Sequence, residues 1–153
     1  MEKMVYQTVK NSYINYILIF IVLTLQLQAK QTYNSIIIDK VTSIYDGDTF
    51  RVNINSYPSI IGNKISIRVK GIDTPEIRTK CIKEKLLARE AKQLTVSTLR
   101  GAKTIELRDM QRGKYFRIVA DVYVDGVSLG DILIKNNLAV KYDGGTKVKD
   151  WCK

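Results

Sequence analysis

The amino-acid sequence predicts an α+β fold built on a five-stranded β-barrel with two to three helices. Five segments are rich in β-branched residues or alternate between apolar and polar side chains, as strands do. One longer segment has the 3.6-residue period of a helix and lies between the third and fourth of them. The 153 residues of the chain suit one such domain with a short appendage.

Three strands are expected before the long helix. Residues 35–44 are β-branched, and the Asp46-Gly47 pair that follows them is typical of a hairpin turn. Residues 49–55 alternate as the second strand. A loop over residues 57–63 contains a proline and a glycine. Residues 64–70 alternate again and form the third expected strand.

The second half of the chain begins with a helix over residues 83–99, in which apolar side chains recur three and four residues apart, and Gly101 ends it. Strands follow at residues 104–108 and 117–124. Ser128 opens a capping box for a short helix that runs to about Lys135. Five strands with a helix between the third and fourth is the element order of an OB-type barrel.

The charge balance suits a polyanionic partner. The net charge is +10, from 25 basic and 15 acidic residues. Nucleic acid, an anionic membrane surface or an acidic polymer would all be attracted, and solubility alone is the simpler alternative. OB-type barrels commonly bind oligonucleotides, which favours nucleic acid.

Several kinds of site are excluded by composition. The chain has no histidine, so a Ser-His-Asp triad or a histidine base is impossible. Two cysteines do not complete a four-ligand zinc site. Any metal would therefore be a hard cation held by oxygen atoms.

Residues 1–29 are expected to be a secretory signal peptide. Lys3 and Lys10 precede the apolar run 17–25, and Leu27-Gln28-Ala29 offers a loose cleavage site. The run is short for a membrane span, although an uncleaved anchor is the alternative and would bring the protein to a membrane. We expect a secreted, periplasmic or cell-surface protein that is a monomer.

Export makes a disulfide between Cys81 and Cys152 the favoured state of the two cysteines, with two free thiols as the alternative. The bridge would close a loop of about 70 residues and stabilise the fold by on the order of 4 kcal/mol. We expect the mature chain to consist of an OB-type domain at residues 35–145 and a C-terminal tail at residues 146–153.

Three short segments carry candidate chemistry: Asp46-Gly47-Asp48-Thr49, Arg68-x4-Asp73-Thr74-Pro75-Glu76 and Lys114-Tyr115-Phe116-Arg117. Taken singly, they can be an acidic hairpin turn, a surface loop and a solvated basic loop. Together and in this order they closely resemble the pattern of the staphylococcal nuclease (thermonuclease) family. The resemblance extends from about Val41 to Tyr142.

This resemblance implies a Ca²⁺-dependent endonuclease that cleaves DNA, and we expect RNA as well, leaving 3′-phosphate ends. The implied metal ligands are the carboxylates of Asp48 and Asp73 and the backbone carbonyl of Thr74. The implied catalytic residues are Arg68, Glu76 and Arg117. Lys114 and Tyr115 fall on positions that contact the terminal phosphate of a bound nucleotide.

The residue types suit these roles on physical grounds. Guanidinium groups donate paired hydrogen bonds to phosphate oxygens, where charge builds up during attack on phosphorus. Two aspartates supply the anionic oxygens that a hard cation prefers. Glu76 is the available carboxylate to activate water as a general base.

Substrate strands are expected along a basic surface, with Lys70, Lys114 and Tyr142 as candidates for backbone and stacking contacts. Tyr142 could equally be a tyrosine at the edge of the core. Phe116 stands where the family usually has a small residue, which we expect to shift the backbone at Arg117. The loop at residues 56–64 and the segment 142–145 also differ from the family's type enzyme. We therefore expect contacts with the nucleotide base to change more than the catalytic residues.

Two other functions compete with a nuclease. A noncatalytic OB-fold module that binds nucleic acid would not need the two arginines, the glutamate and both aspartates together. A membrane-tethered basic adaptor would leave the spacing of the three segments unexplained.

Overall fold

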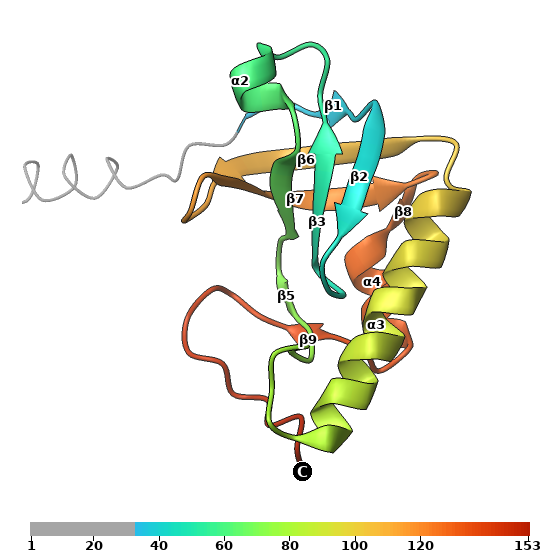
Figure 1. The fold of residues 1–153 in the computed structure, drawn as a ribbon, viewed down its shortest axis with the longest axis vertical. Coiled ribbons are helices and arrows are strands. Elements are labelled where there is room, and N and C mark those ends of the chain that lie inside the picture. The colour runs from blue at the N-terminus through green and yellow to red at the C-terminus, as the bar shows by residue number, and fades with distance from the viewer. Residues whose placement is uncertain (1–32) are drawn as a thin grey trace, which may run out of the picture. The chain divides into compact units, whose positions relative to one another are not determined.

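The computed structural model describes residues 33–153, so the expected signal peptide lies outside the described residues. Between residues 33 and 153 there is no helix of the length and hydropathy needed to cross a membrane. Most of the strands belong to one curled sheet (Figure 1). Its members are β1 (Ile36–Ile37), β2 (Lys40–Ile44), β3 (Thr49–Asn53), β4 (Ile65–Val69), β6 (Ile105–Arg112), β7 (Arg117–Val124) and β8 (Val127–Ser128).

The sheet closes because its first strand is bent. Neighbouring strands follow the order β1-β6-β7-β4-β3-β2, so the two ends of this path are β1 and β2, which are nearly contiguous in sequence. The backbone N–H of Ile38 donates to Ile105, and that of Asp39 donates to Asn53 on the other edge. The first expected strand is thus one chain segment that pairs with both ends of the sheet. The prediction of an α+β barrel is confirmed.

The barrel interior is filled by the alternating apolar faces of the strands. In β7 every second residue from Ile118 to Val124 is buried, as the period-two pattern predicts. The long helix α3 (Ile82–Gly101) covers the barrel with Ala88, Ala91, Thr95 and Leu99, and α4 (Leu129–Lys135) packs beside it. The predicted cap of α4 is present, because the Ser128 hydroxyl accepts a hydrogen bond from the N–H of Asp131.

Some elements differ from the expected ones. The loop 57–63 contains a four-residue helix, α2 (Ser59–Gly62). The strand expected at residues 104–108 continues to Arg112 through an irregularity in register, where Asp109 has a φ of 48°. A separate pair of two-residue strands, β5 (Ile72–Asp73) and β9 (Val140–Lys141), was not expected. This pair brings the second motif against the C-terminal part of the chain.

Candidate active site

The first motif forms the turn between β2 and β3, and α3 holds it in place. The buried hydroxyl of Thr95 donates a 2.7 Å hydrogen bond to the carbonyl of Gly47. A Cβ atom at Gly47 would lie 2.8 Å from the Cβ of Ala91, so only glycine allows the helix to approach this closely. The carbonyl of Asp48 accepts from the N–H of Val69 at 2.8 Å, which sets Asp48 beside the end of β4.

Arg68 lies between two buried carboxylates. Its Nη1 is 2.6 Å from Oδ1 of Asp48, and its Nη2 is 3.8 Å from Oδ1 of Asp73. The Asp48 side chain is 1% exposed and that of Asp73 is 3% exposed. The first and second motifs, 20 residues apart in sequence, therefore meet at one guanidinium.

The second motif leaves the barrel through β5 and positions Glu76 at the surface. Asp73 pairs with Val140 of β9, and Thr74 is buried directly after it. The backbone N–H of Glu76 donates a 3.0 Å hydrogen bond to the carboxylate of Glu84 in the first turn of α3. The Glu76 side chain itself is 48% exposed, so its carboxylate is open to water while its backbone is fixed.

Arg117 approaches from the third motif through the pairing of β7 with β4. These strands are parallel, with Ser66 opposite Arg117 and Arg68 opposite Val119. Residues two apart on a strand point to the same side, so Arg68 points to the same side as Ser66. Ser66 is the partner of Arg117, and the two arginines are therefore diagonal neighbours on the outer face of the sheet. The buried Nε of Arg117 has no hydrogen-bond partner among the described residues, so this arginine is available to a ligand.

The oxygen atoms of this cluster fit a hard cation. Oδ2 of Asp48 is buried and has no hydrogen-bond partner in the described part of the chain. Burial raises the pKa of Asp48, and the nearby guanidinium of Arg68 opposes this rise. Between residues 33 and 153 no three aspartate, glutamate or cysteine side chains form a ready-made cage. The atoms that could coordinate a cation are thus the oxygens of two carboxylates and of neighbouring backbone carbonyls. Ca²⁺ binds oxygen ligands of both kinds.

Asp46, which the sequence analysis assigned only to the turn, is a buried member of the cluster. Burial and then the neighbouring carboxylate of Asp48 raise the pKa of Asp46 to about 7. Its Oδ1 has no hydrogen-bond partner in residues 33–153. The raised pKa shows that the carboxylates repel one another here, and a bound cation would relieve this repulsion.

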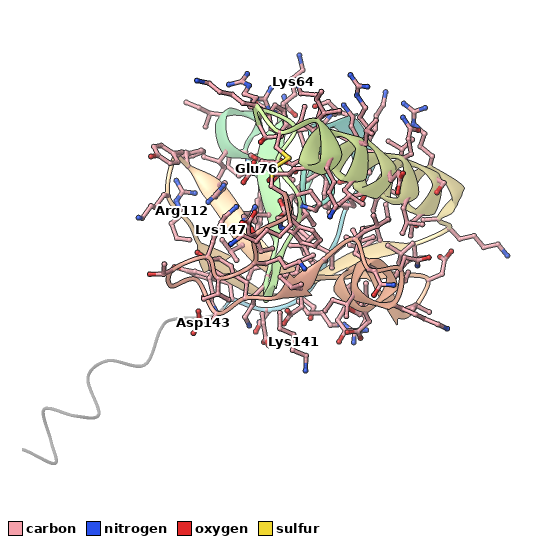
Figure 2. The ribbon with its side chains drawn as sticks, turned by 90° about the horizontal axis from the view of Figure 1, so that it is seen from below. Lys64, Glu76, Arg112, Lys141, Asp143 and Lys147 are labelled. Atoms are coloured by element: carbon pink, nitrogen blue, oxygen red, sulfur yellow. A yellow bond between two sulfur atoms is a disulfide. The ribbon has the colours of Figure 1, made fainter. Side chains whose placement is uncertain are left out.

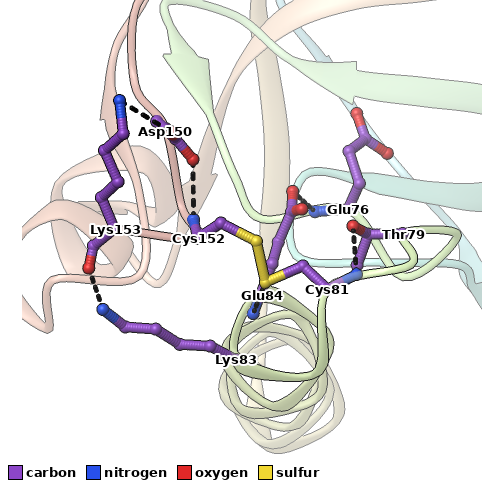
Figure 3. The surroundings of a disulfide bond; sticks show 8 residues. All are labelled: Glu76, Thr79, Cys81, Lys83, Glu84, Asp150, Cys152 and Lys153. Carbon is purple, nitrogen blue, oxygen red and sulfur yellow. Dashed lines mark hydrogen bonds and ion pairs between the residues drawn. A yellow bond between two sulfur atoms is a disulfide. The ribbon is translucent and has the colours of Figure 1, made fainter.

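The C-terminal segment covers the carboxylates. The predicted disulfide between Cys81 and Cys152 is present, with a Cα–Cα distance of 6.2 Å (Figure 3). The Nζ of Lys147 lies 2.7 Å from Oδ1 of Asp73 and 2.6 Å from Oε1 of Glu76, and Figure 2 shows Lys147 and Glu76 side by side. The indole Nε1 of Trp151 donates to Oδ2 of Asp73 at 3.4 Å.

Comparison with known proteins identifies the family of the chain. Residues 66–150 match the family described as staphylococcal nuclease homologue. The chain belongs to this family. It is 34% identical over 116 residues to the SPbeta prophage-derived endonuclease YokF of Bacillus subtilis (strain 168), covering 71% of this chain and 36% of that protein. Endonuclease YncB of the same organism is 34% identical over 113 residues, which cover 69% of this chain and 49% of that protein. The chain thus spans less than half the length of these relatives.

The expected substrate-binding residues are exposed on a turn or engaged in other contacts. Lys114 and Tyr115 lie on the exposed turn between β6 and β7, where Tyr115 is 91% exposed. Lys70 forms ion pairs with Asp121 at 3.4 Å and with Asp109 at 3.7 Å. The hydroxyl of Tyr142 donates to the carbonyl of Gly145 at 2.6 Å, so it helps to shape the C-terminal segment.

Phe116 lies in a left-handed turn directly before Arg117, which is the first residue of β7. Tyr115 and Phe116 have φ values of 57° and 56°, in the left-handed region that favours glycine. The guanidinium of Arg112 lies 3.7 Å from the centre of the Phe116 ring and stacks on it.

Sequence reasoning missed Asp46, Lys147 and Trp151 as members of the site. A signal for the last two existed, because a Cys81–Cys152 bridge necessarily brings the end of the chain to the first turn of α3. Glu76 is fixed to that same turn through Glu84.

Proposed function

We propose that this chain is a calcium-dependent endonuclease that hydrolyses phosphodiester bonds of DNA and RNA and leaves 3′-phosphate ends. The observation that carries the proposal is the position of Arg68 between buried Asp48 and Asp73, with Arg117 on the same face of the parallel neighbouring strand. The names of the two relatives, both endonucleases, support it.

The two arginines would bind the scissile phosphate. A phosphodiester is an anion, and attack on phosphorus adds charge to its nonbridging oxygens. Guanidinium groups from adjacent strands can donate hydrogen bonds to these oxygens at the same time. Donors fixed in this way can contribute about 3 to 4 kcal/mol each to the stability of the transition state.

Glu76 would accept a proton from the attacking water. The water oxygen bonds to phosphorus and its proton passes to the carboxylate. The bond from phosphorus to the 5′ oxygen breaks, and the leaving oxygen takes a proton from solvent. The products are a 3′-phosphate and a 5′-hydroxyl. The exposed carboxylate of Glu76 on a fixed backbone suits this role.

Asp48 and Asp73, with the carbonyl of Thr74, would hold Ca²⁺. The bound ion would supply Lewis-acid neutralisation of the phosphate charge. The unpartnered, buried Oδ2 of Asp48 supports this assignment.

A plasmid digestion assay tests the proposal. Purified protein is incubated with supercoiled DNA, and separately with RNA, in Ca²⁺, in Mg²⁺ and in EGTA, and the product ends are identified by mass spectrometry. Cleavage with Ca²⁺ that yields 3′-phosphates is expected. Full activity in EGTA would remove the calcium assignment, and binding without cleavage in every condition would indicate the noncatalytic module. In the same assay Arg117→Ala should lose cleavage, and Arg89→Ala, on the exposed side of α3, is the control for loss of an arginine.

We further propose that the protein acts outside the cytoplasm as a monomer and meets a membrane only if residues 1–29 stay attached. The Cys81–Cys152 disulfide supports an oxidising compartment. Cell fractionation and light scattering of the purified protein would test both points.

A further inference from the structure

The segment from Tyr142 to Cys152 is fixed at both ends and places one lysine on the carboxylate cluster. At its start, the N–H of Tyr142 donates to Gly71, and the hydroxyl of Tyr142 donates to Gly145. At its end, Cys152 is bonded to Cys81, the N-cap residue of α3. The Lys147 side chain lies between these anchors, 40% exposed.

Trp151 fixes the same segment to the same aspartate. Its side chain is buried, at 8% exposure, and its Nε1 donates to Oδ2 of Asp73. Lys147 contacts the other oxygen, Oδ1. Both oxygens of Asp73 are therefore engaged by the C-terminal segment, one by a neutral donor and one by a cation.

An ammonium group and a metal ion compete for one carboxylate oxygen, because both are cations and each needs direct contact with it. Lys147 contacts Asp73, a proposed calcium ligand, and Glu76, the proposed base. We propose that Lys147 is a tethered counter-cation of the calcium site, which Ca²⁺ must displace, and that the Cys81–Cys152 disulfide sets the strength of this competition. This inference rests on the proposed calcium site.

The tether matters because a free lysine in solution would compete weakly. A half-exposed ion pair is weak on its own. A link to the site raises the effective concentration of the ammonium to the millimolar range or above. Without the disulfide, the segment keeps its attachments at Tyr142 and Trp151 but loses its covalent link to α3, so Lys147 is held less firmly and the competition weakens.

Calcium binding to the full chain, measured by calorimetry in the absence of nucleic acid, tests the inference. Lys147→Met is expected to lower the Kd for Ca²⁺ about three- to tenfold, since roughly 1 kcal/mol of competition is removed. Lys135→Met, which removes the same charge at the exposed end of α4, is expected to change the Kd less than twofold. The intrinsic fluorescence of Trp151, the only tryptophan in the chain, gives a second titration curve.

The disulfide is tested with Cys81→Ser/Cys152→Ser and, should that variant not fold, with wild-type protein in reductant. Opening the bridge is expected to lower the Kd, and to have no further effect in the Lys147→Met background. An unchanged or raised Kd in Lys147→Met, with calcium still bound by the wild type, would overturn the inference and leave the proposed function intact. No calcium binding by either protein would overturn the calcium site itself.

Discussion

Thr95 and Gly47 are joined by a buried 2.7 Å hydrogen bond from hydroxyl to backbone carbonyl, across 48 residues of sequence. This bond attaches the long helix to the turn that carries Asp46 and Asp48. The stability of the helix contact is thereby linked to the geometry of the two carboxylates in this turn.

Thr95→Val should separate this bond from side-chain packing, because valine has nearly the same shape. The buried carbonyl of Gly47 loses its donor, so we expect the free energy of unfolding to fall by about 1 to 3 kcal/mol. Urea unfolding followed by tryptophan fluorescence would measure it. Thr98→Val is the control, since the Thr98 hydroxyl bonds only within its own helix, to Leu94. An equal loss of unfolding free energy in the two variants would contradict a stabilising role for the bond between Thr95 and Gly47.

Gly47→Ala should be destabilising for a different reason. The new Cβ would lie 2.8 Å from the Cβ of Ala91, so the helix or the turn has to shift, at a cost of about 1 to 3 kcal/mol. Ala91→Gly removes the opposing atom and should reduce this cost in the double variant, as thermal unfolding would show. Gly101→Ala, where the added atom meets nothing within 4 Å, should be close to neutral.

The two active-site arginines should respond differently to removal. Arg117→Ala should lower kcat by about 100-fold or more with little change in stability, because its Nε has no partner in the described residues. Arg68→Ala should lower kcat and also destabilise the metal-free protein, because it leaves the buried carboxylate of Asp48 without its cation. Digestion rates and unfolding curves in EDTA measure the two quantities. Similar stability losses in both variants would argue against this distinction.

Glu76→Gln keeps the shape of the side chain but cannot accept the proton from water. We expect kcat to fall by about 100-fold or more while calcium binding is retained. Glu90→Gln on the exposed side of α3 is a matched control. Digestion at the wild-type rate by Glu76→Gln would mean that another group is the base.

Asp46 should make the metal-free protein less stable at pH 8 than at pH 5. Its folded pKa of about 7 lies above the ordinary value of 3.8, so the folded state favours the protonated carboxyl. The resulting stabilisation is complete below pH 3.8 and is lost as the pH rises through 7. Asp46→Asn should therefore raise the free energy of unfolding by about 1 to 3 kcal/mol at pH 8 in EDTA, and much less at pH 5. Urea denaturation at the two pH values would measure this difference. An equal gain in unfolding free energy at pH 5 and pH 8 would contradict a raised pKa of Asp46.

The regular elements could be predicted because their signals are local. The alternation in residues 117–124 and the helical period of residues 83–99 follow from which faces are buried. The two-residue strands β5 and β9 have no such signal, since their pairing depends on where the barrel and α4 bring the chain. The four residues of α2 are equally too few for a period.

The candidate site was predictable to the extent that its residues lie in motifs. Asp48, Arg68, Asp73, Glu76 and Arg117 each belong to a recognisable segment, and the fold brings their strands and loops together. Lys147 lies in a glycine- and lysine-containing stretch with no motif of its own. Its place depends on a disulfide and on the burial of Trp151, which are both properties of the folded chain.

Among the described strands, β4 and β7 form the only parallel pair, and each carries one of the two arginines. Parallel neighbours cannot be joined by a tight turn, so the intervening chain must cross over through α3 and β6 before the second arginine can arrive. During synthesis, a chain that has already made its first three barrel strands still lacks one of the two arginines proposed to bind the phosphate. The proposed nuclease activity would for this reason be a stricter test of complete folding than helix content or collapse. A truncation before residue 117 should yield a chain that contains Arg68 but does not cleave nucleic acid.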